Sequence, residues 1–248
     1  MPTQYIIYQH SSQFLPKIAI KLENMLASIY EGKNVTHPII HHYALKNIVK
    51  LLKIIEKPEL KSRLTKEFLR LDYVLPKQFK EEHANLYQKF ETKSKELQMQ
   101  TSRFGSQLHL DPFLLSLRMR SQDQWNECEL QPPFLFNWLH QHPQYRQDML
   151  AHWLSELKEL KSIISVYSNL LNQLAIYETV DIHQGFYQKT MSAIPPCQLV
   201  IIKLDAELPI IPKIQMSTNA LTVHFNDIVQ HEKTANCEFS MELGLVKI

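Results

Sequence analysis

The segment Pro143–Glu178, PQYRQDMLAHWLSELKELKSIISVYSNLLNQLAIYE, decides how the rest of this chain can fold. Its apolar residues recur at alternating steps of three and four, which places them on one stripe of an α-helix. The stripe comprises Leu150, Trp153, Leu157, Leu160, Ile164, Tyr167, Leu171 and Leu174. Pro143 suits the first helical position, and neither Gly nor Pro follows before Gly185. The spacing predicts one unbroken helix of about 34 residues, about 50 Å long, as the central element of the fold.

The second half of this predicted helix has a wider apolar face than one partner helix could cover. Ile163 and Leu170 flank the stripe, and Val166 and Ile176 add to its breadth. Two interpretations stay open at this point. Either the preceding helices of the same chain pack on this face, or part of the stripe forms the seam of a dimer.

The composition favours helices with sharp ends over a glycine-rich nucleotide-binding fold. The 248 residues include thirteen prolines but only four glycines, and 44% are hydrophobic, which is enough for a substantial core. Cys128, Cys197 and Cys237 are far apart, so we expect reduced thiols and no disulfide framework. Because we find no signal-peptide pattern and no apolar run of about 18 residues, we expect a soluble cytoplasmic protein.

The net charge of +2 is small, but the basic excess lies in the first hundred residues. These carry sixteen Lys and Arg against ten Asp and Glu, whereas residues 101–180 carry six against eight. A predicted basic ridge contains Lys46, Lys50, Lys53, Lys57, Lys61, Arg63, Lys66 and Arg70, opposed only by Glu56, Glu59 and Glu67. Such a ridge is common on solvated helices, and it also suits nucleic acid, anionic lipid or an acidic peptide.

Helical spacing recurs throughout the first 140 residues. Ser11 and Ser12 suit a helix N-cap, and the apolar positions from Leu15 to Ile29 predict a helix with Lys17 and Lys21 on its outward face. Further helices are predicted from Pro38 to Ile55, Leu60 to Leu71, Phe79 to Leu97, Asp111 to Leu117 and Phe134 to Leu139. Together with the central helix they make seven helical segments before residue 180.

Beyond residue 180 the pattern changes to short strands. They are predicted at 185–188, 198–204, 210–216, 220–225 and 236–245, and their short connections favour an antiparallel sheet. The β-prone run Gln4–Gln9 is too short to stand alone, so we expect it to complete that sheet. The predicted fold is α+β, with an α-helical domain at 10–180 and a smaller β-strand domain formed by 1–9 and 181–248.

The usual catalytic motifs are missing from the sequence. It contains no G-x-S-x-G, H-E-x-x-H, GxxxxGK[ST] or GxGxxG pattern. Of the twelve histidines, only His41 with His42 and His140 with His142 are close in sequence, and on a helix neither pair converges on one ion, because the side chains point about 100° or about 200° apart. We expect no catalytic residue, metal or cofactor, with an enzyme of an unrecognised type as the alternative.

Several short motifs resemble those of the Z-ring-associated protein D (ZapD) family, which are cytoplasmic bacterial division factors. These motifs are the basic helix with Lys17, Lys21 and Glu23; Arg103 and Gly105 in a turn; Arg118 and Arg120 in LLSLRMR; Phe136 to Pro143; and, most specifically, Gly185-Phe186-Tyr187-Gln188. Their order and spacing, and the layout of a helical part before a strand part, extend the resemblance over essentially the whole chain.

The resemblance implies a homodimer that binds the C-terminal tail of FtsZ, the tubulin-like division protein, and bundles its filaments at the mid-cell division site. By position it places partner-binding residues at Lys17, Lys21 and Lys57 in the helical part and at His224 in the strand part, and it adds Arg118 and Arg120. A cross-linker needs two tail sites, since one site cannot bridge two filaments. Closed dimer symmetry supplies the two copies.

The chain departs from the family pattern at several of these positions. Asn126-Glu127-Cys128 stands where family members often have a Pro-Gly-Gly stretch, and Ala220 and His224 stand where arginines are usual. A neutral imidazole cannot reproduce the bidentate fork of arginine on a carboxylate, so more of the attraction falls on the helical part. The alternative function is a basic helical module that binds nucleic acid or anionic membrane through the Lys46–Arg70 ridge.

Overall fold

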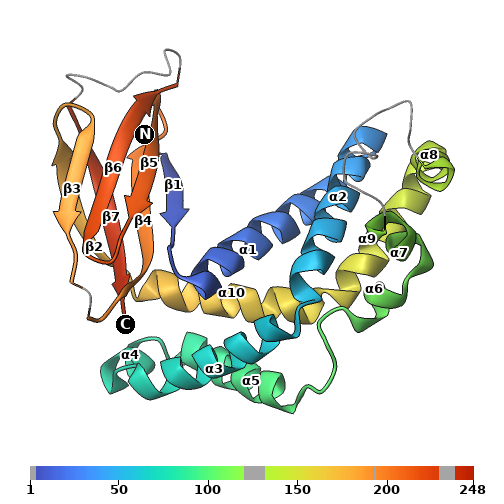
Figure 1. Cartoon of the computed structure of the whole chain (residues 1–248), viewed down its shortest axis with the longest axis horizontal. Coiled ribbons are helices and arrows are strands. Elements are labelled where there is room, and N and C mark those ends of the chain that lie inside the picture. The colour runs from blue at the N-terminus through green and yellow to red at the C-terminus, as the bar shows by residue number, and fades with distance from the viewer. Residues whose placement is uncertain (1–3, 120–131, 193, 229–237) are drawn as a thin grey trace. The chain divides into compact units, whose positions relative to one another are not determined.

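The computed structural model describes residues 4–119, 132–192, 194–228 and 238–248 of the chain. It confirms the predicted α+β fold, in which helices make up one part and antiparallel strands the other (Figure 1). The chain divides into two compact units. A strand unit comprises Met1–Ile20 and Ser168–Ile248, and a helical unit comprises Lys21–Tyr167.

The described residues form more helices than the seven predicted segments. They are α1 (Phe14–Lys33), α2 (Pro38–Ile55), α3 (Pro58–Val74), α4 (Lys77–Glu82), α5 (Ala84–Met99), α6 (Ser106–Leu110), α7 (Pro112–Arg118), α8 (Pro133–His140), α9 (Pro143–Glu156) and α10 (Lys158–Gln173). The segment predicted from Phe79 to Leu97 is two helices, because His83 leaves the helical region at φ −113° and ψ 39°.

Proline begins five of these helices, as the sequence suggests. Its fixed φ and missing N–H suit the first turn, where no intrahelical partner is needed. The residue before it often acts as the cap: Asp111 accepts a hydrogen bond from the Leu114 N–H at 2.9 Å, and the His37 ring accepts one from the Ile39 N–H at 3.3 Å. Local sequence therefore fixes where α2 and α7 begin.

The prediction of one unbroken helix from Pro143 to Glu178 is wrong in two places. The chain leaves the helix at Leu157, with φ −96° and ψ 2°, and a new helix begins at Lys158. Leu157 stays fully buried, so the apolar spacing continues through the break and conceals it. The second error is at the end, because α10 stops at Gln173 and Ile176–Ile182 forms strand β2, whose branched and aromatic residues favour a strand.

The strands form two antiparallel sheets where the sequence predicted one. They are β1 (Tyr5–His10), β2 (Ile176–Ile182), β3 (Phe186–Thr190), β4 (Cys197–Asp205), β5 (Ile210–Met216), β6 (Ala220–Asp227) and β7 (Phe239–Lys247). One sheet has the order β1-β4-β7-β2 and the other β3-β6-β5. The N-terminal strand completes one of these sheets, as predicted, and it pairs with β4, with Tyr8 opposite Ile202.

The two sheets pack face to face around one apolar cluster. Alternate residues of β4 from Val200 to Leu204 and of β6 from Leu221 to Phe225 belong to this buried cluster. Side chains of a strand alternate between its two faces, so Thr222 and His224 lie on the outer face of the β3-β6-β5 sheet. Strand β6 therefore buries its apolar residues on one face and carries His224 on the other.

Candidate functional site

Lys17 and Lys21 lie one helical turn apart on α1, and both side chains are exposed. Neither ammonium group has a carboxylate partner among the described residues. Lys17 lies close enough to His10 to affect its ionisation: burial lowers the pKa of His10, and the charge of Lys17 lowers it further. The two lysines therefore lie on the outward face of α1, as the helical spacing predicts.

Lys57 lies at the junction between α2 and α3, where it is exposed and precedes Pro58. Its backbone is extended, with φ −69° and ψ 118°, and its side chain makes no capping hydrogen bond to the helix. The chain turn at the two helix ends thus presents this lysine to solvent.

Arg118, predicted as a partner contact, is held by other side chains of the helical unit. Its side chain is only 11% exposed, and its Nη2 lies 2.6 Å from Oε2 of Glu56, while Nη1 lies 3.1 Å from Nδ1 of His109. The hydrogen bond from Arg118 lowers the pKa of Glu56, which keeps that carboxylate charged. The ion pair joins α7 to the end of α2, so Arg118 positions neighbouring residues and presents little charge of its own. Arg120 lies outside the described residues.

Arg103 is a candidate contact residue that we did not predict. It is exposed, and its charge acts on both Glu56 and His109, lowering the pKa of each. The pKa of His109 is lowered first by burial and then by Arg118, so the imidazole is neutral near neutral pH. The single negative charge of Glu56 therefore lies near two positive guanidinium groups. The second of these, Arg103, is exposed to solvent.

The ridge predicted from Lys46 to Arg70 is less basic than its sequence suggests. Lys61 donates hydrogen bonds to the backbone carbonyls of Gln100 and Ser102, and Arg70 holds Glu67 through two bonds of 2.9 and 2.8 Å. Arg63 lies 4.0 Å from Glu59. Within the described part of the chain, the ridge cations that stay exposed without an ion pair are Lys50, Lys53, Lys57 and Lys66.

His224 lies in a row of three side chains across the β3-β6-β5 sheet. Phe186 and Lys213 are its register partners on the two neighbouring strands, and the Phe186 and His224 rings lie 5.0 Å apart. Gly185 adopts φ +63°, which a side chain would disfavour, and the residue after it, Phe186, is 42% exposed. The motif from Gly185 to Gln188 therefore begins strand β3 and places the Phe186 ring beside His224.

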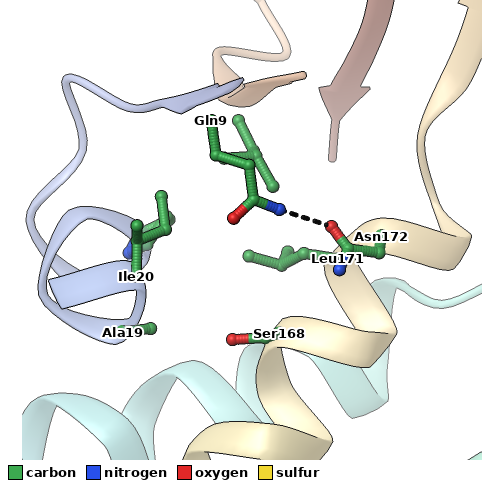
Figure 2. A pocket seen from close by; sticks show the side chains of 8 residues that line it. Gln9, Ala19, Ile20, Ser168, Leu171 and Asn172 are labelled. Atoms are coloured by element: carbon green, nitrogen blue, oxygen red, sulfur yellow. Dashed lines mark hydrogen bonds between the residues drawn. The ribbon is translucent and has the colours of Figure 1, made fainter. Parts of the chain in front are cut away.

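Neither of two cavities lined by described residues of the strand unit includes one of these cations. Figure 2 shows the smaller one, of about 10 Å³, where the Gln9 amide donates a 3.0 Å hydrogen bond to Asn172. That volume holds about one water molecule. A wider cleft of about 230 Å³ is lined by Ser12, Gln13, Met191, Pro196, Cys197, Met216, Ser217 and Thr218. Burial raises the pKa of the Cys197 thiol, which disfavours a reactive thiolate.

Two further features of the described residues bear on the kind of site. The described residues contain no group of three His, Cys, Asp or Glu side chains placed to hold a metal ion. No helix in the described part of the chain is both long and apolar enough to cross a membrane.

These features define an α+β protein whose exposed cations lie on helix and strand surfaces. A model of the ZapD family, described as a cell division protein, matches residues 20–224. Proteins named cell division protein ZapD are similar over nearly their whole length: that of Coxiella burnetii strain RSA 331 is 24% identical with 98% of each chain covered, and that of Aliivibrio fischeri is 24% identical with 96% covered. The ZapD of Azoarcus sp. strain BH72 is 22% identical, over 96% of this chain and 98% of its own. The chain belongs to the ZapD family of cell division proteins.

Proposed function

We propose that this protein is a non-enzymatic cross-linker that binds the acidic C-terminal tail of FtsZ and bundles FtsZ filaments in the cytoplasm at mid-cell. Membership of a family of cell division proteins supports a role in cell division. The proposal also rests on the surplus of exposed positive charge described above, since an acidic peptide needs cations that no carboxylate of the chain already neutralises.

The observation that carries the proposal is the set of exposed cations without carboxylate partners in the described chain. Lys17 and Lys21 on α1 and Lys57 at the α2–α3 junction belong to it. Exposed cations attract an acidic chain over about 10 Å at moderate salt and steer its approach. We assign these three lysines, with Arg103 beside Glu56, as tail contacts.

The row Phe186, His224 and Lys213 is the second contact region in this proposal. Lys213 supplies a charge and Phe186 an apolar surface, while His224 replaces the arginine that is usual in the family. Without the bidentate arginine, this row contributes less to affinity for a carboxylate than an arginine-bearing sheet would.

Bundling also requires that two tails be held at once. We propose that two copies of the chain associate as a homodimer, so that each copy offers its own set of contacts. Two linked sites gain avidity for a filament that displays many tails, without any new contact.

High-speed co-sedimentation with polymerised FtsZ tests the binding step. We expect the protein to pellet with intact FtsZ filaments and to stay in the supernatant with filaments of FtsZ that lack the C-terminal tail. Equal pelleting with both kinds of filament would show that the tail is not the docked segment.

A further inference from the structure

The outward face of α2 carries a stripe whose two ends differ in chemistry. At about 100° per residue, Ile39, Tyr43, Lys50 and Lys53 fall within about 40° of one line along the helix, and Lys57 continues that line just past the helix end. The opposite face of α2 is buried in the helical unit. The stripe is therefore exposed at both ends, apolar at its start and basic at its end, with the half-buried Lys46 on the same line between them.

The apolar end is exposed, and its backbone is held by hydrogen bonds from Arg146. Ile39 is 63% and Tyr43 65% exposed. The buried guanidinium of Arg146 donates to the Thr36 carbonyl at 2.6 Å and to Nδ1 of His41 at 2.8 Å. These bonds hold both Thr36, which precedes α2, and His41 in its first turn. Ile39 and Tyr43 are therefore presented on a rigid backbone, which lowers the entropy lost when a partner binds.

The basic end lacks internal compensation. Among the described residues, no carboxylate lies within 4.0 Å of the ammonium groups of Lys50, Lys53 or Lys57. Glu56, which lies between two of them in sequence, is held by Arg118 at 2.6 Å. Three positive charges are thus left for an external partner.

Two kinds of occupant fit this arrangement poorly. A second copy related by a twofold axis would bring either lysine against lysine or the lysine end against Ile39 and Tyr43, and neither pairing is favourable. An anionic membrane calls for apolar side chains alongside the cations over the length of a helix, whereas here the exposed apolar side chains of Ile39, Ile40 and Tyr43 lie at the start of α2 and the cations at its end.

We propose that the stripe from Ile39 to Lys57 docks an extended acidic peptide, with carboxylates along Lys50, Lys53 and Lys57 and apolar side chains covering Ile39 and Tyr43. The stripe spans about 27 Å, which an extended peptide of about eight residues would match. This inference rests on the proposed function, because it takes the FtsZ tail as the peptide. It adds an apolar anchor to the electrostatic contacts proposed for the helical unit.

The test uses fluorescence anisotropy with a labelled peptide of the FtsZ C-terminal tail and the full-length protein. We expect Ile39→Ser with Tyr43→Ser to weaken binding about tenfold at every salt concentration. The matched control is Tyr73→Ser with Met99→Ser, which removes two side chains that are 91% and 79% exposed elsewhere in the helical unit. This control, and the conservative pair Ile39→Val with Tyr43→Phe, should bind as the unchanged protein does.

A lysine variant separates the two ends of the stripe. Lys50→Gln, Lys53→Gln and Lys57→Gln together should weaken binding at low salt and flatten its salt dependence, because fewer ionic contacts are lost as salt rises. The apolar variant should leave the salt dependence unchanged. Equal thermal unfolding midpoints for all variants would show that the surface, and not the fold, has changed.

Three results would overturn the inference while leaving the proposed function in place. The first is unchanged peptide affinity in the Ile39 and Tyr43 variant. The second is conversion of that variant to a monomer with peptide affinity retained, which would make the stripe an interface between copies. The third is that the Ile39 and Tyr43 variant no longer binds phosphatidylglycerol vesicles but keeps its affinity for the peptide. If the unchanged protein binds neither the peptide nor FtsZ filaments, the proposed function itself fails.

Discussion

Arg146 organises the start of the helical unit although its charge meets no carboxylate among the described residues. Its guanidinium donates to Nδ1 of His41 at 2.8 Å and to the backbone carbonyls of Thr36, Leu139 and Gln141. The last two carbonyls lie at the end of α8, so one side chain joins the α8–α9 connection to the start of α2. Burial lowers the pKa of Arg146, but an arginine stays charged throughout the usual pH range.

Replacing this side chain removes several buried hydrogen bonds at once. We predict that Arg146→Met lowers the free energy of unfolding by about 3 kcal/mol, since the carbonyls lose their donors and are left unpaired. Urea denaturation followed by circular dichroism measures the change. Arg103→Met, at an exposed arginine, is the control and should change stability by less than about 0.5 kcal/mol. A cost of that small size for Arg146→Met would mean that the network contributes little.

Buried histidines make the stability of the fold depend on pH. Burial, followed by the charge of Lys46, lowers the pKa of His42 to about 4, and burial also lowers the pKa of His10, His41 and His109. Each imidazole is protonated more readily in the unfolded chain, where its pKa is about 6.5. Acid therefore favours unfolding, and the stability present above about pH 6.5 is lost as the pH falls toward about 4.

We predict that the free energy of unfolding falls by about 2 kcal/mol through His42 alone over that interval, after allowance for partial solvent screening. Urea titrations at a series of pH values measure this loss. His42→Gln should flatten the pH dependence, whereas His152→Gln, at an exposed position on α9, should leave it as it is. An identical pH profile for His42→Gln and the unchanged protein would contradict the assignment.

At the scale of elements, α1 offers the simplest test of the basic surface. Reversing both of its exposed lysines, with Lys17→Glu and Lys21→Glu, should weaken FtsZ co-sedimentation about tenfold or more, because attraction is replaced by repulsion of an acidic tail. Stability should change by less than about 0.5 kcal/mol, since neither side chain has an ion pair in the described chain to lose.

Lys89→Glu with Lys95→Glu makes the same charge change on α5 and is the matched control. Both of these lysines are exposed. If the two double variants weaken co-sedimentation equally, the effect comes from net charge, and α1 is not a specific contact.

The elements also show which parts of the fold can be predicted from sequence. Starts of helices at Pro38 and Pro143 follow from local chemistry, and so does the change from helical to strand periodicity. The break at Leu157 could not be predicted, because the buried leucine keeps the apolar spacing intact across it. The division of the strands into two sheets could not be predicted either, since strand order is set by pairings between distant segments.

The candidate site shows the same limit. Exposure of Lys17 and Lys21 follows from helical spacing alone, so the sequence predicts it correctly. The burial of Arg118 depends on Glu56 and His109, which come from other elements, so no local pattern reveals it. Arg103 was not proposed from the sequence for the complementary reason: it becomes a candidate only once Glu56 is seen to be already engaged by Arg118.

At the scale of the whole molecule, bridging depends on the number of chains. We predict that light scattering coupled to size exclusion gives a mass of about two 29.2 kDa chains, with two tail peptides bound at saturation. The exposed apolar and basic surfaces described here then occur in pairs. A mass of one chain with one bound peptide, at every concentration tested, would remove the means of cross-linking.

Low-speed sedimentation of polymerised FtsZ tests the central claim most directly, because single filaments stay in the supernatant and bundles pellet. We predict that adding this protein moves intact FtsZ into the low-speed pellet and leaves FtsZ without its C-terminal tail in the supernatant. Bundling of both forms, or of neither, would contradict cross-linking through the tail.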